Sequence, residues 1–230
     1  MKRFPNHNKM KININLREKF QISRNEAERL LKAGKIKVNG KIVKGSTELT
    51  GKEKIEIIKN ISKKEYFAYN KPYGLLTQGT KEEKSVVTLF KKHDLFPIGR
   101  LDKDSEGLMI LTNDGTITSK ILETESKKEK EYEVETDKPI PKKAETIFRR
   151  GMESRELGKL KPAQVKITAD KRARISIIEG KKHQIRIMFL EMGAKVIKLK
   201  RVRIASVELG ALKPGQKRPL TKKELASLIS

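Results

Sequence analysis

Cysteine is absent from the 230-residue sequence, and histidine is scarce. Without cysteine the chain can form no disulfide framework, and neither thiolate catalysis nor a cysteine-type zinc site is open to it. The three histidines, His7, His93 and His183, lie far apart in the sequence and lack metal-ligand spacing. We therefore expect no metal centre.

Long apolar runs are also missing. No segment approaches the length of a membrane span, and the first residues, MKRFPNHNKMKI, lack the apolar core of a signal peptide. We expect a cytoplasmic protein without a membrane partner, and a monomer is the simplest expectation.

Acidic residues are few beside basic ones. Lys and Arg number 54 against 29 Asp and Glu, which gives a formal charge of +25, and the excess is spread along the chain. A field of this sign attracts polyanions, of which nucleic acid is the most common in a cell. The alternative is a lysine-rich protein whose charge serves solubility alone.

The first 60 residues show a helix followed by a hairpin. Residues 22–34, ISRNEAERLLKAG, predict a helix that Ser23 caps, with Glu26 placed to complete a capping box. The next segment, KIKVNGKIV, alternates like a strand on both sides of Asn39 and Gly40, the pair that favours a type I′ turn.

This stretch, SRNEAERLLKAGKIKVNGKIV, resembles the S4 RNA-binding domain. The resemblance implies that residues 1–60 form such a domain and dock on structured RNA through the helix. The other interpretation is an ordinary solvated charged face. The basic residues that we expect to contact RNA are Arg24, Arg29, Lys32 and Lys35.

Residues 61–230 alternate between many short strand-like runs and a few helical ones. Strands that follow one another without regular helical crossovers favour a mixed, mainly antiparallel sheet. We therefore predict an α+β protein with a small N-terminal domain and a larger second domain.

The stretch GRLDKDSEGLMILTNDG, residues 99–115, places Asp102 and Asp104 in a loop before an apolar strand. Such a pair can close a turn, bind Mg²⁺, act as a base or attack as a nucleophile. The whole string decides among these, because it resembles the signature of the Rsu/Rlu family of ribosomal RNA pseudouridine synthases, with Ser105 in place of the usual Thr.

Other segments resemble the same family: NKPYGLLTQ, EKEYEV, EGKKHQIRIMF and the C-terminal KLKRVRIASVELGALKPGQKRPLTKKEL. The resemblance implies a pseudouridine synthase catalytic domain over residues 61–230. Pseudouridine formation breaks the bond from ribose C1′ to uracil N1 and rejoins the base through C5. It therefore needs no cofactor.

The resemblance also implies the catalytic residues. Asp102 is expected to react at a flipped-out uridine, either as a nucleophile or as the base that starts glycal formation. Tyr132 is expected to lie against the target base and help to move the C5 proton. Arg186 is expected to form an ion pair with Asp102 and so keep that carboxylate ionised.

Three further residues are expected to bind the substrate. Arg100 precedes Asp102 by two positions and points the same way in an extended segment. The resemblance implies that this arginine contacts the RNA and helps to hold the flipped nucleotide, and the alternatives are a phosphate contact or an ordinary surface arginine. Ile185 resembles the apolar residue beneath the family's active site, and Lys71 is expected to shape the site and touch a phosphate.

The expected target is ribosomal RNA. The variable segments favour a uridine in a peptidyl-transferase-region stem-loop of 23S ribosomal RNA, with a 16S uridine as the runner-up, on naked RNA or on a ribosome-assembly intermediate. A different class is a non-catalytic RNA-binding ribosome-assembly factor. Such a factor could lose Asp102, Tyr132 and Arg186, and all three are present.

Overall fold

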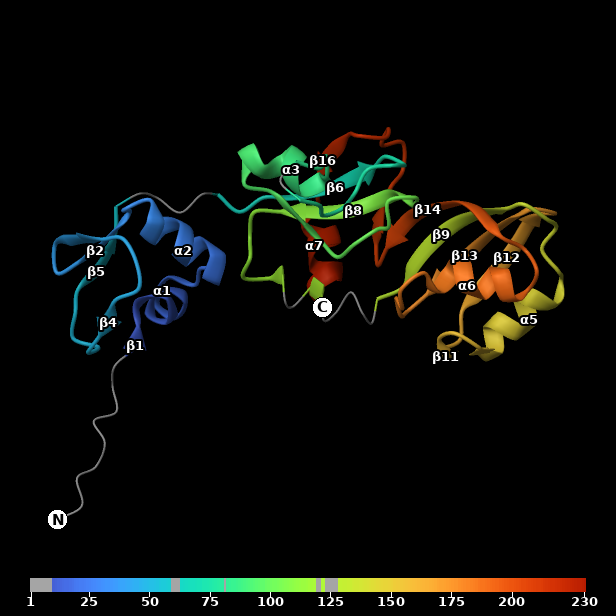
Figure 1. Cartoon of the computed structure of the whole chain (residues 1–230), viewed down its shortest axis with the longest axis horizontal. Coiled ribbons are helices and arrows are strands. Elements are labelled where there is room, and N and C mark those ends of the chain that lie inside the picture. Colours follow the sequence, from blue (N-terminus) through green and yellow to red (C-terminus); the bar gives the residue numbers. More distant parts are fainter. Residues whose placement is uncertain (1–9, 59–62, 81, 119–120, 123–127) are drawn as a thin grey trace, which may run out of the picture. The chain divides into compact units, whose positions relative to one another are not determined.

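The computed structural model describes residues 10–58, 63–80, 82–118, 121–122 and 128–230. The chain divides into two compact units (Figure 1). The first comprises Met1–Lys64 with Asp114–Thr118, and the second comprises Glu65–Asn113 with Ser119–Ser230. No helix among the described residues is long and apolar enough to cross a membrane.

The first unit packs two helices on short strands. Its core is apolar and includes Ala27, Leu30 and Leu31 of the second helix. Strands β3, β2 and β5 form an antiparallel sheet, and β1 pairs with β4. The elements are β1 (Met10–Lys11), α1 (Ile12–Phe20), α2 (Arg24–Lys32), β2 (Ile36–Val38), β3 (Lys41–Val43), β4 (Glu48–Leu49) and β5 (Ile55–Ile57).

Local chemistry fixes the helix start and the hairpin of this unit. The Ser23 hydroxyl accepts a hydrogen bond from the Glu26 amide at 3.2 Å, which caps α2. Asn39 and Gly40 have φ values of 50° and 80°, as a type I′ turn requires. The Asn39 side chain also accepts from the Lys54 amide at 2.8 Å, which ties the hairpin to the segment before β5.

The second unit is built on a nine-stranded sheet, and the predicted strands and helices are present in it. Its elements are β6 (Tyr66–Lys71), α3 (Val86–Phe90), the 3₁₀ helix η1 (Lys91–His93), β7 (Phe96–Ile98), β8 (Glu106–Thr112), β9 (Lys130–Thr136), α5 (Lys143–Arg150), β10 (Glu153–Ser154), β11 (Gly158–Lys159), β12 (Gln164–Ala169), β13 (Arg172–Ile177), α6 (Gln184–Glu191), β14 (Val196–Ile204), β15 (Val207–Glu208), β16 (Lys217–Pro219) and α7 (Lys222–Ile229).

One alternating segment near the C-terminus forms two strands instead of one. The run KVIKLKRVRIASVEL turns back at Ala205, whose φ is 50°, so that β15 pairs with the end of β14. A non-glycine residue in this left-handed conformation is uncommon, and the alternating pattern on both sides of it hides the turn.

The sheet order is β12-β13-β9-β14-β8-β6-β16, with β7 beside β8 and β15 beside β14. Every pair is antiparallel except β14 with β8, which confirms the mixed, mainly antiparallel prediction. Register aligns Gly107 with Arg201, and Arg201 with Tyr132, in one row across β8, β14 and β9.

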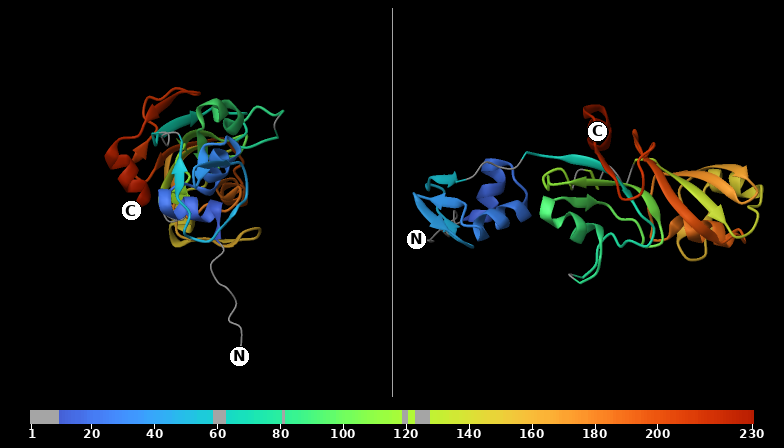
Figure 2. Two further views of the ribbon diagram at one scale, coloured as in Figure 1. Left: turned by 90° about the vertical axis from the view of Figure 1, so that its left-hand side faces the viewer. Right: turned by 90° about the horizontal axis from the view of Figure 1, so that it is seen from above.

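One continuous apolar core includes residues of α3, α5 and α6 together with the sheet residues that face them. Phe148 of α5 and Phe189 of α6 meet edge to face at 5.3 Å, and Figure 1 shows these two helices next to each other. Figure 2 shows α7 on the side of the sheet opposite α3. The loop that contains Asp102 precedes β8 and belongs to the face that carries this core.

Candidate active site

The loop between β7 and β8 carries Asp102. A turn bond runs from the Ser105 amide to the Asp102 carbonyl at 3.1 Å. The Thr77 hydroxyl donates to the Leu101 carbonyl at 2.6 Å and accepts from the Leu101 amide at 3.1 Å. These bonds fix the backbone on both sides of Asp102, while 42% of its side chain stays exposed. The carboxylate is therefore accessible on a restrained loop.

Lys71, at the end of β6, braces this loop from within. It is fully buried, and its Nζ donates to the carbonyls of Leu75 at 2.6 Å and Pro72 at 3.0 Å. The same Nζ lies 3.5 Å from the Lys103 carbonyl, which also accepts from the Gly74 amide at 2.9 Å. The segment after β6 and the Asp102 loop are thereby joined at the residue next to Asp102.

The expectation that Lys71 touches a phosphate is wrong for this structure, because its ammonium group is enclosed and bonded to carbonyls. Burial lowers the Lys71 pKa to about 8, against the opposing attraction of Asp104, Asp102 and Glu106. Its contacts instead brace the loop. Because lysine is rarely buried in full, the sequence does not indicate that this lysine is enclosed.

Arg186, in the first turn of α6, binds the same loop from the other side. Its guanidinium donates to the Asp104 carbonyl at 2.8 Å and to the Val196 carbonyl at 3.1 Å, and it lies 3.3 Å from Asp104 Oδ2. The predicted ion pair with Asp102 is therefore wrong. The turn from Asp102 to Ser105 gives the two aspartates different surroundings, and Asp104 is the one that meets Arg186.

His183, which the sequence did not single out, is the side chain that lies beside the Asp102 carboxylate. Its Nε2 lies 3.6 Å from Asp102 Oδ1, and both side chains are nearly half exposed. His183 precedes α6 in the left-handed conformation, with φ of 54°. Its place in the HQIR motif, three residues before Arg186, is the signal that could have pointed to it.

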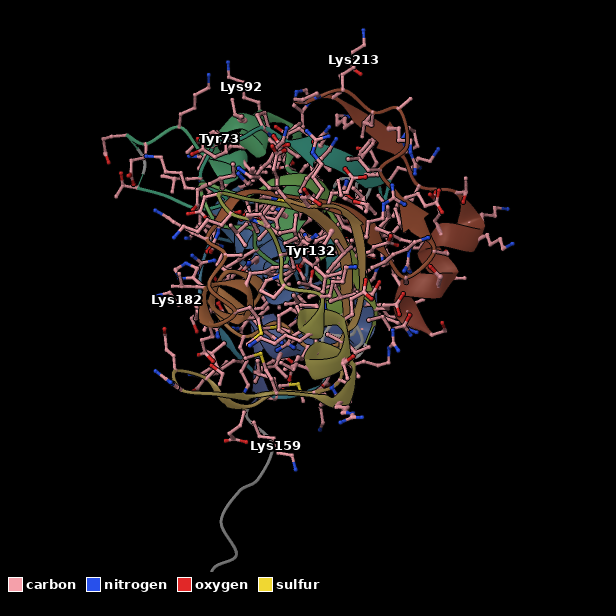
Figure 3. All side chains as sticks on the ribbon, turned by 90° about the vertical axis from the view of Figure 1, so that its right-hand side faces the viewer. Tyr73, Lys92, Tyr132, Lys159, Lys182 and Lys213 are labelled. Carbon is pink, nitrogen blue, oxygen red and sulfur yellow. The ribbon has the colours of Figure 1, made fainter. Side chains whose placement is uncertain are left out.

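Tyr132 and Ile185 lie in the apolar cluster that underlies this region. Tyr132 is 8% exposed on β9, and Figure 3 shows it in the interior of the unit. Tyr132 on β9 is in register with Arg201 on β14, and Arg201 is in register with Gly107 on β8. Tyr132 and Gly107 are therefore two strands apart, a separation of about 10 Å. Ile185, on α6, is also buried.

Arg100 begins the loop and is exposed. Within the described residues its side chain has no hydrogen bond or ion pair, so its guanidinium is available to a ligand. The structure thus brings Asp102, Asp104, His183 and Arg186 together around one loop, with Arg100 at its entrance.

The basic helix α2 of the first unit keeps part of its charge in local pairs. Arg24 pairs with Glu28 at 3.0 Å, and Arg29 lies 3.8 Å from Glu26. Exposed pairs of this kind are weak, so a phosphate can replace them. Lys32 is exposed and Lys35 half-buried.

An exposed carboxylate among cations is suited to attack or proton transfer at a bound anionic polymer. Among the described residues no three His, Asp or Glu side chains are grouped so that they could hold a metal ion.

Comparison with known proteins agrees with both units. A family model described as RNA pseudouridylate synthase matches residues 65–191, and an S4 domain model matches residues 14–55. A crystal structure of a pseudouridylate synthase superposes with a TM-score of 0.69 and 30% identity, over 95% of this chain and 99% of that one.

Three curated relatives cover nearly the whole chain. Ribosomal large subunit pseudouridine synthase B of Bacillus subtilis is 38% identical over 90% of both chains. Dual-specificity RNA pseudouridine synthase RluF of Escherichia coli is 36% identical over 96% of this chain and 78% of its own. Ribosomal small subunit pseudouridine synthase A of Haemophilus influenzae is 32% identical over 96% of this chain and all of its own.

The S4 match lies within the first structural unit, and the larger match lies in the second unit apart from Asp114–Thr118. The 17-residue stretch that contains Asp102 falls inside the larger match. The chain therefore belongs to the RNA pseudouridylate synthase family, and it is an RNA pseudouridine synthase with an N-terminal S4 domain.

Proposed function

We propose that this enzyme converts a specific uridine of ribosomal RNA to pseudouridine and that Asp102 is the residue that reacts. The observation that carries this proposal is the restrained, accessible Asp102 carboxylate beside His183. A carboxylate must be both exposed and held in place to meet a nucleotide that has left its helix.

In the proposed reaction Asp102 either attacks ribose C1′ or removes a proton from the ribose, and the bond from C1′ to uracil N1 breaks. The base then turns over and C5 bonds to C1′, while the Asp102–C1′ bond breaks in the first route and the ribose regains its proton in the second. The C5 proton leaves and N1 gains a proton, so that product and substrate have the same atoms. Both routes use the Asp102 carboxylate, whose Oδ1 lies 3.6 Å from His183 Nε2.

The neighbouring residues take supporting roles in this proposal. Arg186 is a positioning residue, because it holds the Asp104 carbonyl instead of the reacting carboxylate. Tyr132 supplies a ring against the uracil from β9, and Arg100 binds the RNA backbone at the entrance of the loop. Lys71 keeps the loop in shape through carbonyl contacts.

We further propose that residues 1–60 act as a separate RNA-docking domain. The sequence similarity to S4 domains and the basic surface of α2 support this assignment. The domain then adds affinity for structured RNA without taking part in the chemistry.

For the target we propose a uridine of 23S ribosomal RNA. The support is the similarity to a large-subunit enzyme, 38% identical, compared with 32% for a small-subunit enzyme. The dual-specificity relative, at 36%, lies between them. A 16S uridine remains the alternative target.

The reacting residue is tested by Asp102→Asn, which keeps the shape of the side chain and removes its charge. We expect release of tritium from 5-labelled uridine to stop while RNA binding and the unfolding midpoint stay as in the wild type. Asp170→Asn is the matched control, because Asp170 is exposed in a turn of the same unit. If Asp102→Asn releases tritium at the wild-type rate, Asp102 is not the residue that reacts.

The target is tested by carbodiimide modification and primer extension on ribosomal RNA from cells with and without the protein. We expect one stop to disappear from 23S RNA. A stop that disappears only from 16S RNA would replace the 23S proposal. If no stop disappears from either RNA, the substrate is not ribosomal.

A further inference from the structure

Tyr73 is the most exposed aromatic side chain in the described part of the chain. It is 64% exposed, and every other aromatic residue described there is buried or half-buried. Figure 3 labels Tyr73 toward one side of the view and Tyr132, which is 8% exposed, near its centre. A large ring left in water needs an explanation when the rest of the aromatic residues pack into the core.

The backbone that carries Tyr73 is restrained on both sides. The preceding Pro72 accepts from Lys71 Nζ at 3.0 Å, and the following Gly74 donates to the Lys103 carbonyl at 2.9 Å. Gly74 has φ of 77°, a conformation that favours glycine, so the turn is defined by its sequence. The exposed ring therefore stands on a fixed turn.

This turn lies next to the Asp102 loop. Gly74 is bonded to Lys103, and consecutive Cα atoms are about 3.8 Å apart, so Tyr73 and Asp102 are each one residue away from that bond. A nucleotide chain that presents one uridine to Asp102 thus passes Tyr73 with a neighbouring nucleotide.

Unpaired cations lie on the neighbouring loop that contains Asp102. Arg100 and Lys103 are exposed, and neither side chain has an ion pair within the described residues. An exposed aromatic ring with free cations around it is the composition of sites that hold single-stranded nucleic acid, where bases stack on the ring and cations hold phosphates.

We propose that Tyr73 is a stacking platform for an unpaired nucleobase adjacent to the target uridine. The inference rests on the proposed function only in that the RNA must reach Asp102. Stacking there compensates for the contacts that the neighbouring base gives up when the uridine leaves the helix. Because every base has a π-face, the platform adds affinity and not sequence choice.

The test measures binding to a fluorescent RNA hairpin that contains the mapped uridine and 2-aminopurine on one side of it or the other. Asp102→Asn serves as the parent protein, so that any turnover is slow. We expect Tyr73→Ala and Tyr73→Leu to raise Kd about 5- to 150-fold and to abolish quenching of 2-aminopurine at one of the two positions. Tyr73→Phe keeps the ring and should bind within about twofold of the parent.

Leu190→Ala is the matched control, because Leu190 is 58% exposed at the end of α6. Unfolding midpoints of all variants verify that the fold is intact. Equal binding by Tyr73→Ala and the parent overturns the proposal. If Tyr73→Leu binds RNA as tightly as the parent, the proposal is also overturned, because an apolar contact and not stacking then provides the affinity. If Tyr73→Ala binds RNA weakly while the Asp102→Asn single variant keeps full tritium release, the role of Tyr73 is supported. In that case only the assignment of Asp102 as the reacting residue is rejected.

Discussion

The guanidinium of Arg186 donates to the Asp104 carbonyl at 2.8 Å and approaches the Asp104 carboxylate at 3.3 Å. Its strongest contact is thus with the backbone of the loop, two residues beyond Asp102. An arginine placed in this way would position Asp102, the residue that we propose to react, without touching it.

From this relationship we expect Arg186→Ala to lower the single-turnover rate about 100-fold at saturating RNA, because small misplacements of reacting groups have effects of that size. The Kd for RNA should change little. Asp104→Asn should have a much smaller effect, since it removes only a partly exposed ion pair and keeps the carbonyl contact. Weaker RNA binding with an unchanged rate would instead make Arg186 a phosphate ligand.

The buried ammonium group of Lys71 predicts a pH dependence of stability. The Lys71 pKa is about 8 in the folded protein, compared with 10.5 for an ordinary lysine such as that of the unfolded chain. Between these values the unfolded chain binds a proton that the folded chain does not, so the free energy of unfolding rises with pH across this window. This gain in the free energy of unfolding is absent below about pH 8 and complete above about pH 10.5.

Urea unfolding of the wild type and Lys71→Met across this window measures the contribution. We expect the wild type to gain up to about 3 kcal/mol relative to the variant as the pH rises. Lys213→Met, at an exposed lysine, should keep a constant difference from the wild type. A constant difference for Lys71→Met would show that the ammonium group titrates normally.

The close approach of β14 to β8 predicts a strict requirement for glycine at position 107. A Cβ at Gly107 would lie 2.2 Å from the Arg201 carbonyl oxygen, and the Gly107 φ of 104° disfavours any side chain. We expect Gly107→Ala to lower the free energy of unfolding by at least about 2 kcal/mol.

Gly180→Ala is the control for that substitution, because nothing lies within 4 Å of its added Cβ and its φ is not in the positive range. Its effect should stay within about 0.5 kcal/mol. Chemical unfolding followed by circular dichroism measures both variants. Similar stabilities for the two would mean that β14 moves away at little cost.

The basic helix of the first unit predicts a salt-dependent share of RNA affinity. Neutralising Lys32 and Lys35 as glutamines should weaken RNA binding and lower the slope of log Kd against log salt by about one for each phosphate that is no longer bound. The single-turnover rate at saturation should not change. Lys222→Gln with Lys223→Gln removes the same charge from α7 and should leave the slope intact. An equal effect of both pairs would assign the affinity to net charge alone.

Patterns in the sequence predicted most of the fold because local chemistry determines it. Asn39 and Gly40 favour one hairpin turn, and the alternation in β9 leaves Tyr132 and Val134 facing the core. Such signals act over a few residues and do not depend on distant parts of the chain.

The contacts of the candidate site could not be predicted in the same way. Asp102 and Asp104 are equivalent in the sequence pattern, and only the turn between them decides which one meets Arg186. The enclosure of Lys71 depends on carbonyls of two separate loops, and the approach of His183 to Asp102 depends on a left-handed residue before α6. These are three-dimensional facts without a local pattern.

The short parallel pairing of β14 with β8 has a consequence for folding. It aligns only Lys200 with Glu106 and Arg201 with Gly107, yet among the described residues it is the one ladder that joins one half of the sheet, β12-β13-β9-β14, to the other half, β8-β6-β16. The Asp102 loop precedes β8 in one half, whereas Tyr132 and Arg186 belong to the other. Each half can form its own antiparallel ladders early, because those contacts are mostly closer in sequence. The residues around Asp102 come together only when the two halves have joined, so we expect enzymatic competence to depend on this short parallel ladder.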